Sequence, residues 1–160
     1  MYIRTYEPSD LPSLINLTVE TFRPYFEDFL HPLLGDDLFQ HQQGAWVQDY
    51  YDGIPTLHDP QNQRFVAVAE FDGEIVGYVA WRIEDERHHG EIDLLAVASS
   101  ARRQQMGLNL CRFAVEQMRA EGVEAVEIGT GDDEFHSAAR GLYEALGFIK
   151  IPTAHYLMAI

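Results

Sequence analysis

The chain has 160 residues, of which 46% are hydrophobic, and its 26 acidic against 11 basic residues give a formal net charge of −15. This length suits one domain with a buried core. The acidic excess disfavours binding to nucleic-acid phosphates or anionic membranes and favours a cationic partner. The single cysteine, Cys111, excludes an internal disulfide framework and a multi-cysteine metal site, so we expect no metal. The sequence shows no membrane-length apolar run and no secretory signal pattern, which predicts a cytoplasmic location.

Hydrophobic spacing and turn residues divide the chain into strands and helices. Asp72 and Gly73 join two β-rich runs and predict a hairpin. Gly122 and Gly147 mark helix ends, and Ser9 is a candidate N-cap for the first helix. In chain order we expect a strand at Tyr2–Tyr6, a helix through Leu11–Val19, interruptions at Pro24, Pro32 and Gly35, a helix at Asp36–Tyr51, strands at Arg64–Phe71, Glu74–Ile83 and Glu91–Val97, a helix at Gln105–Glu121, a strand at Val123–Ile128, a helix at Glu134–Ala145, and a last strand pair at Phe148–Ile151 and Ala154–Ala159.

This order predicts a mixed α/β (α+β) domain. We expect a central sheet of six to seven strands with helices on both faces. The β-α-β passages near the C-terminus predict that the sheet includes a parallel or splayed pair of strands.

The acidic residues are unevenly distributed along the chain. Residues 1–100 hold 18 acidic and 5 basic residues, a net charge of −13, whereas residues 101–160 have a net charge of −2. Aromatic residues are interleaved with the acids of residues 20–59, which indicates either a solvated acidic face or a recognition surface for a positively charged molecule. The candidate binding residues of this segment are Tyr25, Glu27, Asp28, Asp49 and Asp52.

Residues 92–108 have the pattern of a strand, a basic turn and the start of a helix. The unpaired N–H groups at a helix N-terminus bind anions such as pyrophosphate. Arg102 and Arg103 form the one adjacent basic pair of the sequence, and Gly107 would let the backbone approach a ligand closely. The segment therefore predicts a phosphate site, with a solvated arginine pair on an ordinary turn as the alternative.

The same segment resembles the central motif of the GNAT superfamily of acetyl-CoA-dependent N-acetyltransferases. Residues 102–107, Arg-Arg-Gln-Gln-Met-Gly, are similar to Arg/Gln-x-x-Gly-x-Gly/Ala, with Gln105 where the family usually has Gly. Residues 139–148 are similar to a second motif, Ala-x-x-Leu-Tyr-x-x-x-Gly-Phe, and His136 stands where the family often has Asn. The resemblance implies a GNAT-like, mostly antiparallel sheet with a splayed parallel pair. It also implies one domain over residues 1–160, with residues 1–63 on the acceptor side and residues 64–160 as the acetyl-CoA-binding core.

The resemblance further implies an acetyl transfer from acetyl-CoA, as co-substrate, to a primary amine. Tyr143 matches the family's usual general acid, which protonates the departing thiolate. Amides of Leu95 and Val97 would pair with the pantetheine arm, and His136 would replace Asn as a contact to CoA. The full set of expected cofactor contacts is Leu95, Ala96, Val97, Arg102, Arg103, Gln104, Gln105, Met106, Gly107, Leu108, His136, Ala139 and Tyr143.

The catalytic base has several candidates. Glu91 and Asp93 lie two residues apart on one strand and so share a face. Glu91 stands six residues before Val97, where some family members place a catalytic Glu, and Glu127 is a third carboxylate. A positioned carboxylate can accept the proton of the amine, but these residues could instead bind a cationic acceptor.

The acidic N-terminal part predicts a small cationic amine as acceptor. An aminoglycoside antibiotic fits, because carboxylates pair with its ammonium groups and rings pack against its sugars; this would make the chain an antibiotic-resistance enzyme. A polyamine, another small amine, a protein amine or a non-catalytic CoA sensor are the alternatives. Dimers are common in the family, so a homodimer is the assembly that the resemblance suggests. The expected acceptor residues are Tyr25, Glu27, Asp28, Asp49, Asp52, Trp81, Glu91 and Asp93.

Overall fold

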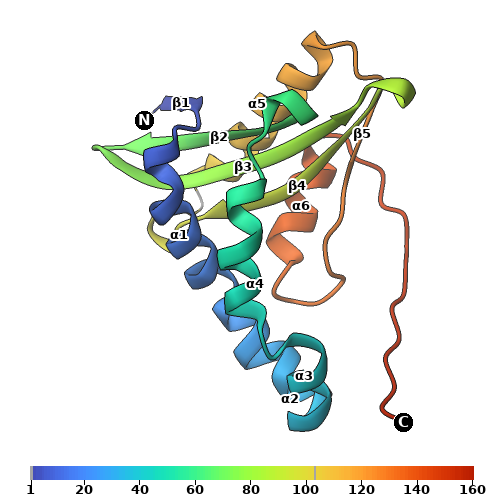
Figure 1. Cartoon of the computed structure of the whole chain (residues 1–160). Coiled ribbons are helices and arrows are strands. Elements are labelled where there is room, and N and C mark those ends of the chain that lie inside the picture. The colour runs from blue at the N-terminus through green and yellow to red at the C-terminus, as the bar shows by residue number, and fades with distance from the viewer. Residues whose placement is uncertain (1, 103) are drawn as a thin grey trace.

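The computed structural model describes residues 2–102 and 104–160, and its centre is one five-stranded sheet (Figure 1). The strands lie in the order β1-β2-β3-β4-β5. The helices and strands are β1 (Tyr2–Thr5), α1 (Leu11–Pro24), η2 (Tyr25–Leu30), α2 (His31–Leu34), α3 (Asp36–Gln43), α4 (Trp46–Gly53), β2 (Arg64–Phe71), β3 (Glu74–Glu84), β4 (His89–Val97), α5 (Met106–Ala120), β5 (Ala125–Ile128) and α6 (Ser137–Ala145), with single 3-10 turns η1 (Pro8–Asp10), η3 (Ile54–Thr56), η4 (Pro60–Asn62), η5 (Asp85–Arg87) and η6 (Ser99–Ala101).

The sheet is antiparallel from β1 to β4 and parallel between β4 and β5. The predicted hairpin at Asp72-Gly73 is confirmed, and both residues adopt positive φ angles, 51° and 82°, as this kind of turn requires. The parallel pair arises because α5 carries the chain back across one face of the sheet before β5 begins.

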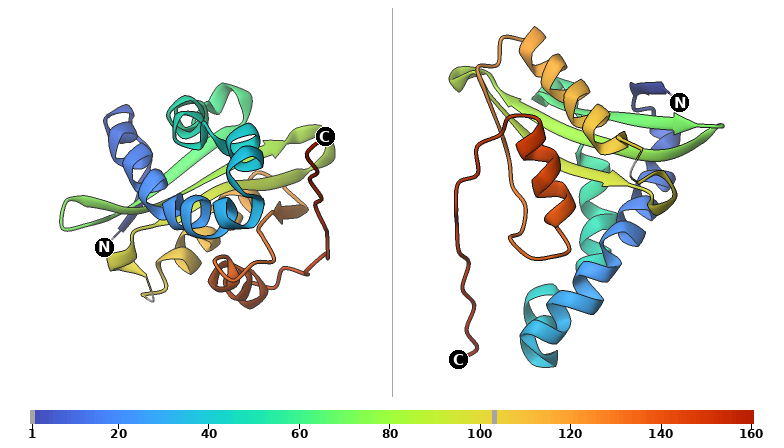
Figure 2. Two further views of the ribbon diagram at one scale, coloured as in Figure 1. Left: turned by 90° about the horizontal axis from the view of Figure 1, so that it is seen from below. Right: turned by 180° about the vertical axis from the view of Figure 1, so that it is seen from behind.

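Helices cover both faces of the sheet (Figure 2). On one face α1 packs over a cluster that contains the fully buried Leu14 and Tyr78. Thr18 of α1 is also fully buried, and its hydroxyl lies 2.5 Å from the Tyr78 hydroxyl, which fixes the helix on β3. On the other face α5 and α6 cover a second cluster that includes Trp81 and Leu110.

Residues 11–53 form a helical arm that extends beyond the sheet (Figure 1). The expected interruption at Gly35 is confirmed, since α2 ends before it and α3 begins after it. At Pro24 the α-helix α1 ends, but the chain continues directly as η2. The expected interruption at Pro32 is wrong, since this residue lies in the first turn of α2, where a missing N–H is tolerated. Between Pro24 and Pro32, η2 is a π-helix, a form often found at functional sites. A stacked pair, Phe26 and Trp46, with ring centroids 4.6 Å apart, forms part of the core of the arm.

Three further expectations about elements are wrong. Ser9 does not cap α1; Glu7 and Asp10 form a capping box around η1, and α1 follows directly. The expected helix 36–51 is two helices, α3 and α4, separated at Gly44 and Ala45. The last strand pair is missing, so the sheet has five strands in the described chain rather than six or seven.

Residues 149–160 form an extended, exposed segment without regular structure (Figure 1). Pro152 lies in the middle of this run and cannot donate a ladder hydrogen bond, which disfavours a strand there. None of the helices described is long and apolar enough to cross a membrane.

Candidate active site

The parallel strands β4 and β5 separate at a β-bulge. In the β3–β4 pairing Ala80 lies opposite Leu94 and Trp81 opposite Ile92, so Asp93 is an extra residue on β4. The β4–β5 pairing ends at the same place, with Ile92 opposite Ile128. Because β5 ends at Ile128, residues 93–97 of β4 have no partner strand on this edge among the described residues, and we call this unpaired stretch the opening.

Two backbone amides of β4 point to this free edge. The N–H of Ala98 donates to the carbonyl of Val76 on β3, with an N···O distance of 2.9 Å. Because successive N–H groups of a strand point to opposite edges, the amides of Leu95 and Val97 point away from β3 and into the opening. An extended, amide-containing chain could pair with them as another strand would.

The N-terminus of α5 lies directly after this edge. The first backbone bond of the helix runs from the N–H of Asn109 to the carbonyl of Gln105, at 2.9 Å. The amides of Met106, Gly107 and Leu108 therefore have no partner within the helix and can bind an anion. Arg102 stands in the preceding turn, where it is exposed, while the predicted contact of Arg103 lies outside the described residues.

Gln105 has a left-handed backbone conformation, with φ 58° and ψ 14°. This conformation favours glycine, because a Cβ crowds the backbone there. Gln105 stands where the GNAT motif usually has glycine, and a glycine at this position would relieve the backbone strain.

Gly107 is required by packing between helices. A Cβ on this residue would lie 2.8 Å from Cδ1 of Leu142 and 3.7 Å from Cδ2 of Leu95. The missing side chain lets α5 and α6 approach each other, which accounts for the glycine without a ligand. Its contact with acetyl-CoA stays a prediction, as do those of Gln104, Leu108 and Ala139. Ala96 and Met106 have buried side chains, so they could contribute backbone groups alone.

Tyr143 lies on α6 and is 9% exposed. Burial raises the pKa of its hydroxyl above the ordinary value, and the nearby Cys111 thiol adds to the effect. The group therefore stays protonated through neutral and moderately alkaline pH, as a proton donor must. The Tyr143 hydroxyl has no hydrogen-bond partner among the described residues. No fully buried polar side-chain atom there lacks a partner, so this hydroxyl oxygen must be accessible.

The carboxylates of Glu91 and Asp93 share one arginine. Two nitrogens of the Arg82 guanidinium donate separately to Glu91 Oε2 and Asp93 Oδ1. Burial raises the pKa of Asp93, and the charge of Glu91 raises it further, while Arg82 opposes the shift. Glu127, the third candidate base, lies on β5, where its carboxylate is 3.5 Å from His89 Nε2 and largely exposed.

A cavity of about 370 Å³ lies between the helical arm and the bulge of β4. Asp49 and Asp93 supply its carboxylates, and aromatic rings of Phe26, Trp46 and Tyr50 supply much of its wall. Burial raises the pKa of Tyr50 to about 12, so its phenol is neutral at physiological pH. The cavity thus combines negative charge with aromatic surface, which suits an organic cation.

The other predicted acceptor residues lie outside this cavity. Glu27 accepts a hydrogen bond from Arg23 and Asp52 accepts one from Gln48, and both carboxylates are on exposed helix surface, as is Asp28. Trp81 is 5% exposed and packs with Phe65 and Phe113 on the opposite face of the sheet, in the core under α5. Its side chain is therefore on the other side of β3 from this cavity, and its contact with the acceptor stays a prediction.

Tyr25 of the helical arm is in contact with His136, which directly precedes α6. The rings lie edge to face with centroids 4.8 Å apart, and Phe135 packs against both. His136 Nδ1 lies 2.7 Å from Asp133 Oδ2, and its backbone N–H donates to Asp133 Oδ1 at 3.1 Å. His136 therefore faces the helical arm as well as the end of α6.

The chain matches the model of the acetyltransferase (GNAT) family over residues 12–148. It belongs to this family. Among curated relatives, GCN5-related N-acetyltransferase 6, chloroplastic, of Arabidopsis thaliana is 40% identical over 73 residues, which are 46% of this chain and 25% of that protein. Mycothiol acetyltransferase of Streptomyces griseus is 28% identical over 152 residues, which are 91% of this chain and 48% of that protein. The chain thus spans between a quarter and about half of the length of these two relatives.

Solved structures share the fold of this GNAT family member. A GNAT acetyltransferase of Staphylococcus aureus Mu50 has a TM-score of 0.71 at 18% identity, with 94% of this chain and 85% of that chain covered. An aminoglycoside acetyltransferase from an uncultured soil sample, in complex with sisomicin, has a TM-score of 0.66 at 19% identity, with 99% and 95% covered. The predicted mixed α/β GNAT fold with a parallel pair is therefore confirmed, with fewer strands than expected.

Sequence reasoning missed three residues that organise this site. Arg82 neutralises Glu91 and Asp93, and its register opposite Glu91 depends on how β3 and β4 pair, which no local pattern reveals. Asp133 pairs with His136, and its position three residues before the histidine could have indicated this pair from the sequence. Phe135 joins the loop after β5 to the helical arm. Across the described residues, no group of three or more His, Cys, Asp or Glu is placed to hold a metal ion.

Proposed function

We propose that the chain is an N-acetyltransferase that moves an acetyl group from acetyl-CoA to the amine of a small cationic acceptor. The observation that carries this proposal is the opening at the Asp93 bulge. There the unpaired β4 edge, which leads to the N-terminus of α5, meets at Asp93 and Leu94 a cavity lined by carboxylates and aromatic rings. One side of the opening suits an anionic, amide-containing donor, and the other suits a cation.

The residues of the opening fit acetyl-CoA. The amides of Leu95 and Val97 are free to pair with the amide-containing pantetheine arm. The amides of residues 106–108 and the guanidinium of Arg102 suit the pyrophosphate. Bound acetyl-CoA supplies a thioester carbonyl for attack and a thiolate as leaving group. Tyr143, kept protonated by its burial, gives the proton that the departing sulfur needs.

On the acceptor side, Asp49 and Asp93 attract ammonium groups, and the rings of Trp46 and Tyr50 pack against the carbon skeleton. An aminoglycoside matches this combination, and the likeness to the fold of an aminoglycoside acetyltransferase agrees with it. A polyamine, another small amine or a protein amine is the alternative acceptor. A CoA sensor without turnover is the alternative function, but the accessible Tyr143 hydroxyl favours catalysis.

The acceptor class is tested by measuring thiol release from acetyl-CoA with kanamycin, spermidine and a lysine peptide. We expect kanamycin to be the best acceptor. Turnover of the peptide or of simple amines alone would contradict the aminoglycoside proposal.

Asp49→Asn tests the cavity itself. The loss of one charge-assisted hydrogen bond should raise the acceptor KM roughly tenfold with little change in the KM for acetyl-CoA. Asp37→Asn removes the same charge from exposed helix surface on α3 and should leave both constants unchanged. Equal effects of the two substitutions would show that general acidity, rather than the cavity, attracts the acceptor.

A further inference from the structure

His136, which lies between the helical arm and α6, pairs with a carboxylate in the way that a general-base histidine does. His136 Nδ1 lies 2.7 Å from a carboxylate oxygen of Asp133, and the side chain of Asp133 is 9% exposed. Burial alone would raise the pKa of Asp133, but the hydrogen bonds from His136 hold that pKa below the ordinary value, so the carboxylate is ionised. An ionised partner makes Nδ1 the donor, which leaves the lone pair on Nε2 free.

The free nitrogen has room to act. The structure gives Nε2 of His136 no hydrogen-bond partner within residues 2–102 and 104–160, and the side chain is 16% exposed. The charged and titratable groups around the ring are Asp133 in the loop, Tyr25 on η2 and Arg140 on α6. Arg140 donates to the carbonyls of Gly131 and Asp133, which fixes the loop that carries the histidine's partner.

His136 and Tyr143 lie on the same face at the two ends of one stretch of helix. His136 directly precedes α6, and Tyr143 follows seven residues later, which is about two helical turns and places both on one face. Seven residues of helix span roughly 10 Å. The two side chains therefore leave the backbone on the same side, about two helical turns apart.

His136 also faces the acceptor half. Its ring packs on Tyr25, which in turn packs on Phe26 of the acceptor cavity at a centroid distance of 5.2 Å. The carboxylates of Glu91 and Asp93 are engaged by Arg82 instead. The guanidinium of Arg82 thus occupies oxygens of both carboxylates, whereas Nε2 of His136 has no hydrogen-bond partner among the described residues and can accept a proton.

We propose that His136, oriented by Asp133, is the general base that takes the proton from the acceptor amine. This inference rests on the proposed acetyltransferase function. The amine nitrogen attacks the thioester carbonyl, a C–N bond forms, and the C–S bond breaks. Nε2 of His136 takes one proton from the nitrogen and Tyr143 gives one to the sulfur. Solvent then deprotonates the imidazolium and returns a proton to the tyrosine, so the chain is unchanged. Asp133 is a positioning residue, and Asp49 and Asp93 attract the cationic acceptor.

The test is the pH profile of thiol release by His136→Asn, the substitution that restores the residue common in the family. We expect kcat to fall about 100-fold near pH 7, with the affinity for acetyl-CoA, measured by calorimetry, unchanged. The defect should shrink as pH rises, because hydroxide in the solvent can then take the proton from the attacking nitrogen in place of His136. Asp133→Asn should cause a smaller fall in kcat and a shifted pH profile.

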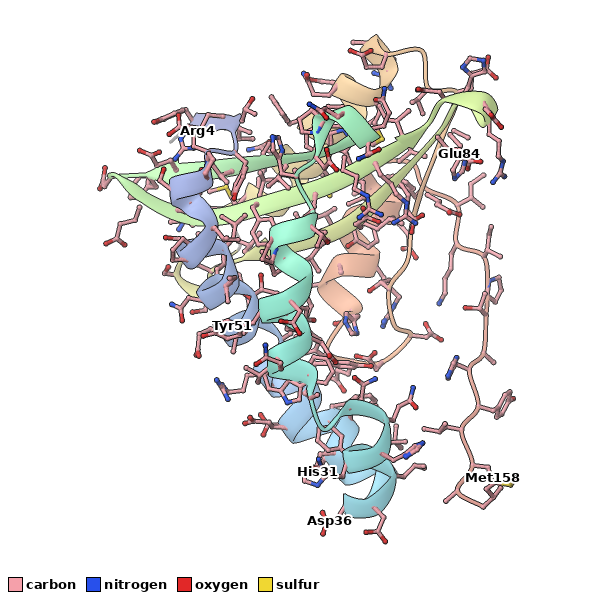
Figure 3. The ribbon with its side chains drawn as sticks, viewed as in Figure 1. Arg4, His31, Asp36, Tyr51, Glu84 and Met158 are labelled. Atoms are coloured by element: carbon pink, nitrogen blue, oxygen red, sulfur yellow. The ribbon has the colours of Figure 1, made fainter. Side chains whose placement is uncertain are left out.

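The control is His31→Asn. His31 also pairs with an aspartate, Asp36, with Nε2 and Oδ1 2.7 Å apart, but the pair lies at the far end of the helical arm (Figure 3). This variant should keep wild-type activity. The base role is overturned if the His136→Asn enzyme is active with the wild-type pH profile, or if it loses acetyl-CoA affinity alone. Either outcome leaves the proposed function intact. A wild type that releases no thiol with any amine contradicts the function itself.

Discussion

Gln105 carries a conformational strain that a single substitution can relieve. Its φ of 58° places a Cβ in the left-handed region, at a cost of about 1–2 kcal/mol relative to ordinary backbone. Gln105→Gly removes this strain but adds freedom to the unfolded chain, which offsets up to about 1 kcal/mol. We therefore expect the free energy of unfolding, measured by urea denaturation, to stay equal or rise by about 1 kcal/mol.

Gln117→Gly provides the matched comparison in the same helix. Gln117 is exposed in the interior of α5, so glycine there should lower the free energy of unfolding by about 1 kcal/mol. A similar loss at both positions would show that Gln105 is not strained.

At the level of the elements, β1, η1 and β2 are joined by two partly buried ion pairs that share Arg4. Asp10 is 7% exposed and accepts two hydrogen bonds from Arg4, at 2.7 and 2.9 Å, and one from the N–H of Glu7 at 2.8 Å. Arg4 also donates to Glu70 on β2 at 2.9 Å. The network fixes the entry of the chain into α1 and hence the position of the helical arm.

Asp10→Asn should destabilise the fold in a pH-dependent way. The hydrogen bonds from Arg4 outweigh burial and hold the pKa of Asp10 below its unfolded value. The carboxylate therefore stabilises the fold above the unfolded pKa, and this contribution is lost as pH falls through the folded pKa. We expect the variant to lose about 1–3 kcal/mol at pH 7, measured by denaturation, and the difference from wild type to shrink below pH 4.

Asp28→Asn, on exposed surface, should change the unfolding free energy by less than about 0.5 kcal/mol. An Asp10 variant that loses the same free energy at pH 7 and pH 3 would contradict the ionic account.

Much of this fold could be predicted from local pattern. The bounds of β2 match the prediction residue for residue, and α5 differs by one residue at each end, because alternation and helical spacing were clean there. The predictions that failed concern long-range pairing and proline position. Pro24 lies at the end of α1 and Pro32 at the start of α2, so neither breaks the arm, and the strands expected within residues 148–160 have no partner strand in the described chain.

The sequence predicted less of the candidate site than of the fold. The strand–turn–helix of residues 92–108 and the place of Tyr143 came from motifs, and in the structure Tyr143 packs in the same buried cluster as Met106 and Leu110 of α5. The bulge at Asp93 and the shared arginine depend on strand register, which only the folded sheet defines. The structure also divides the predicted acceptor acids, placing Asp49 and Asp93 in a cavity and leaving Glu27, Asp28 and Asp52 on exposed helix surface.

For the whole molecule, the charge distribution matches the two sides of the site. The helical arm belongs to residues 1–100, with their net charge of −13, and forms most of the cavity wall. The proposed donor loop belongs to residues 101–160, whose net charge is −2 and where a helix N-terminus adds partial positive charge. An overall acidic protein can thus accept an anionic donor and attract a cationic acceptor on adjoining surfaces.

We propose that acetyl transfer takes place at the opening beside the β4 bulge, with Tyr143 as the acid. The direct measurement is the rate of thiol release from saturating acetyl-CoA and an amine acceptor by the wild type, Tyr143→Phe and the exposed-tyrosine control Tyr51→Phe. The account predicts steady release by the wild type and by Tyr51→Phe. It predicts a kcat about 100-fold lower for Tyr143→Phe, with acetyl-CoA affinity retained. Equal rates for Tyr143→Phe and the wild type would contradict it.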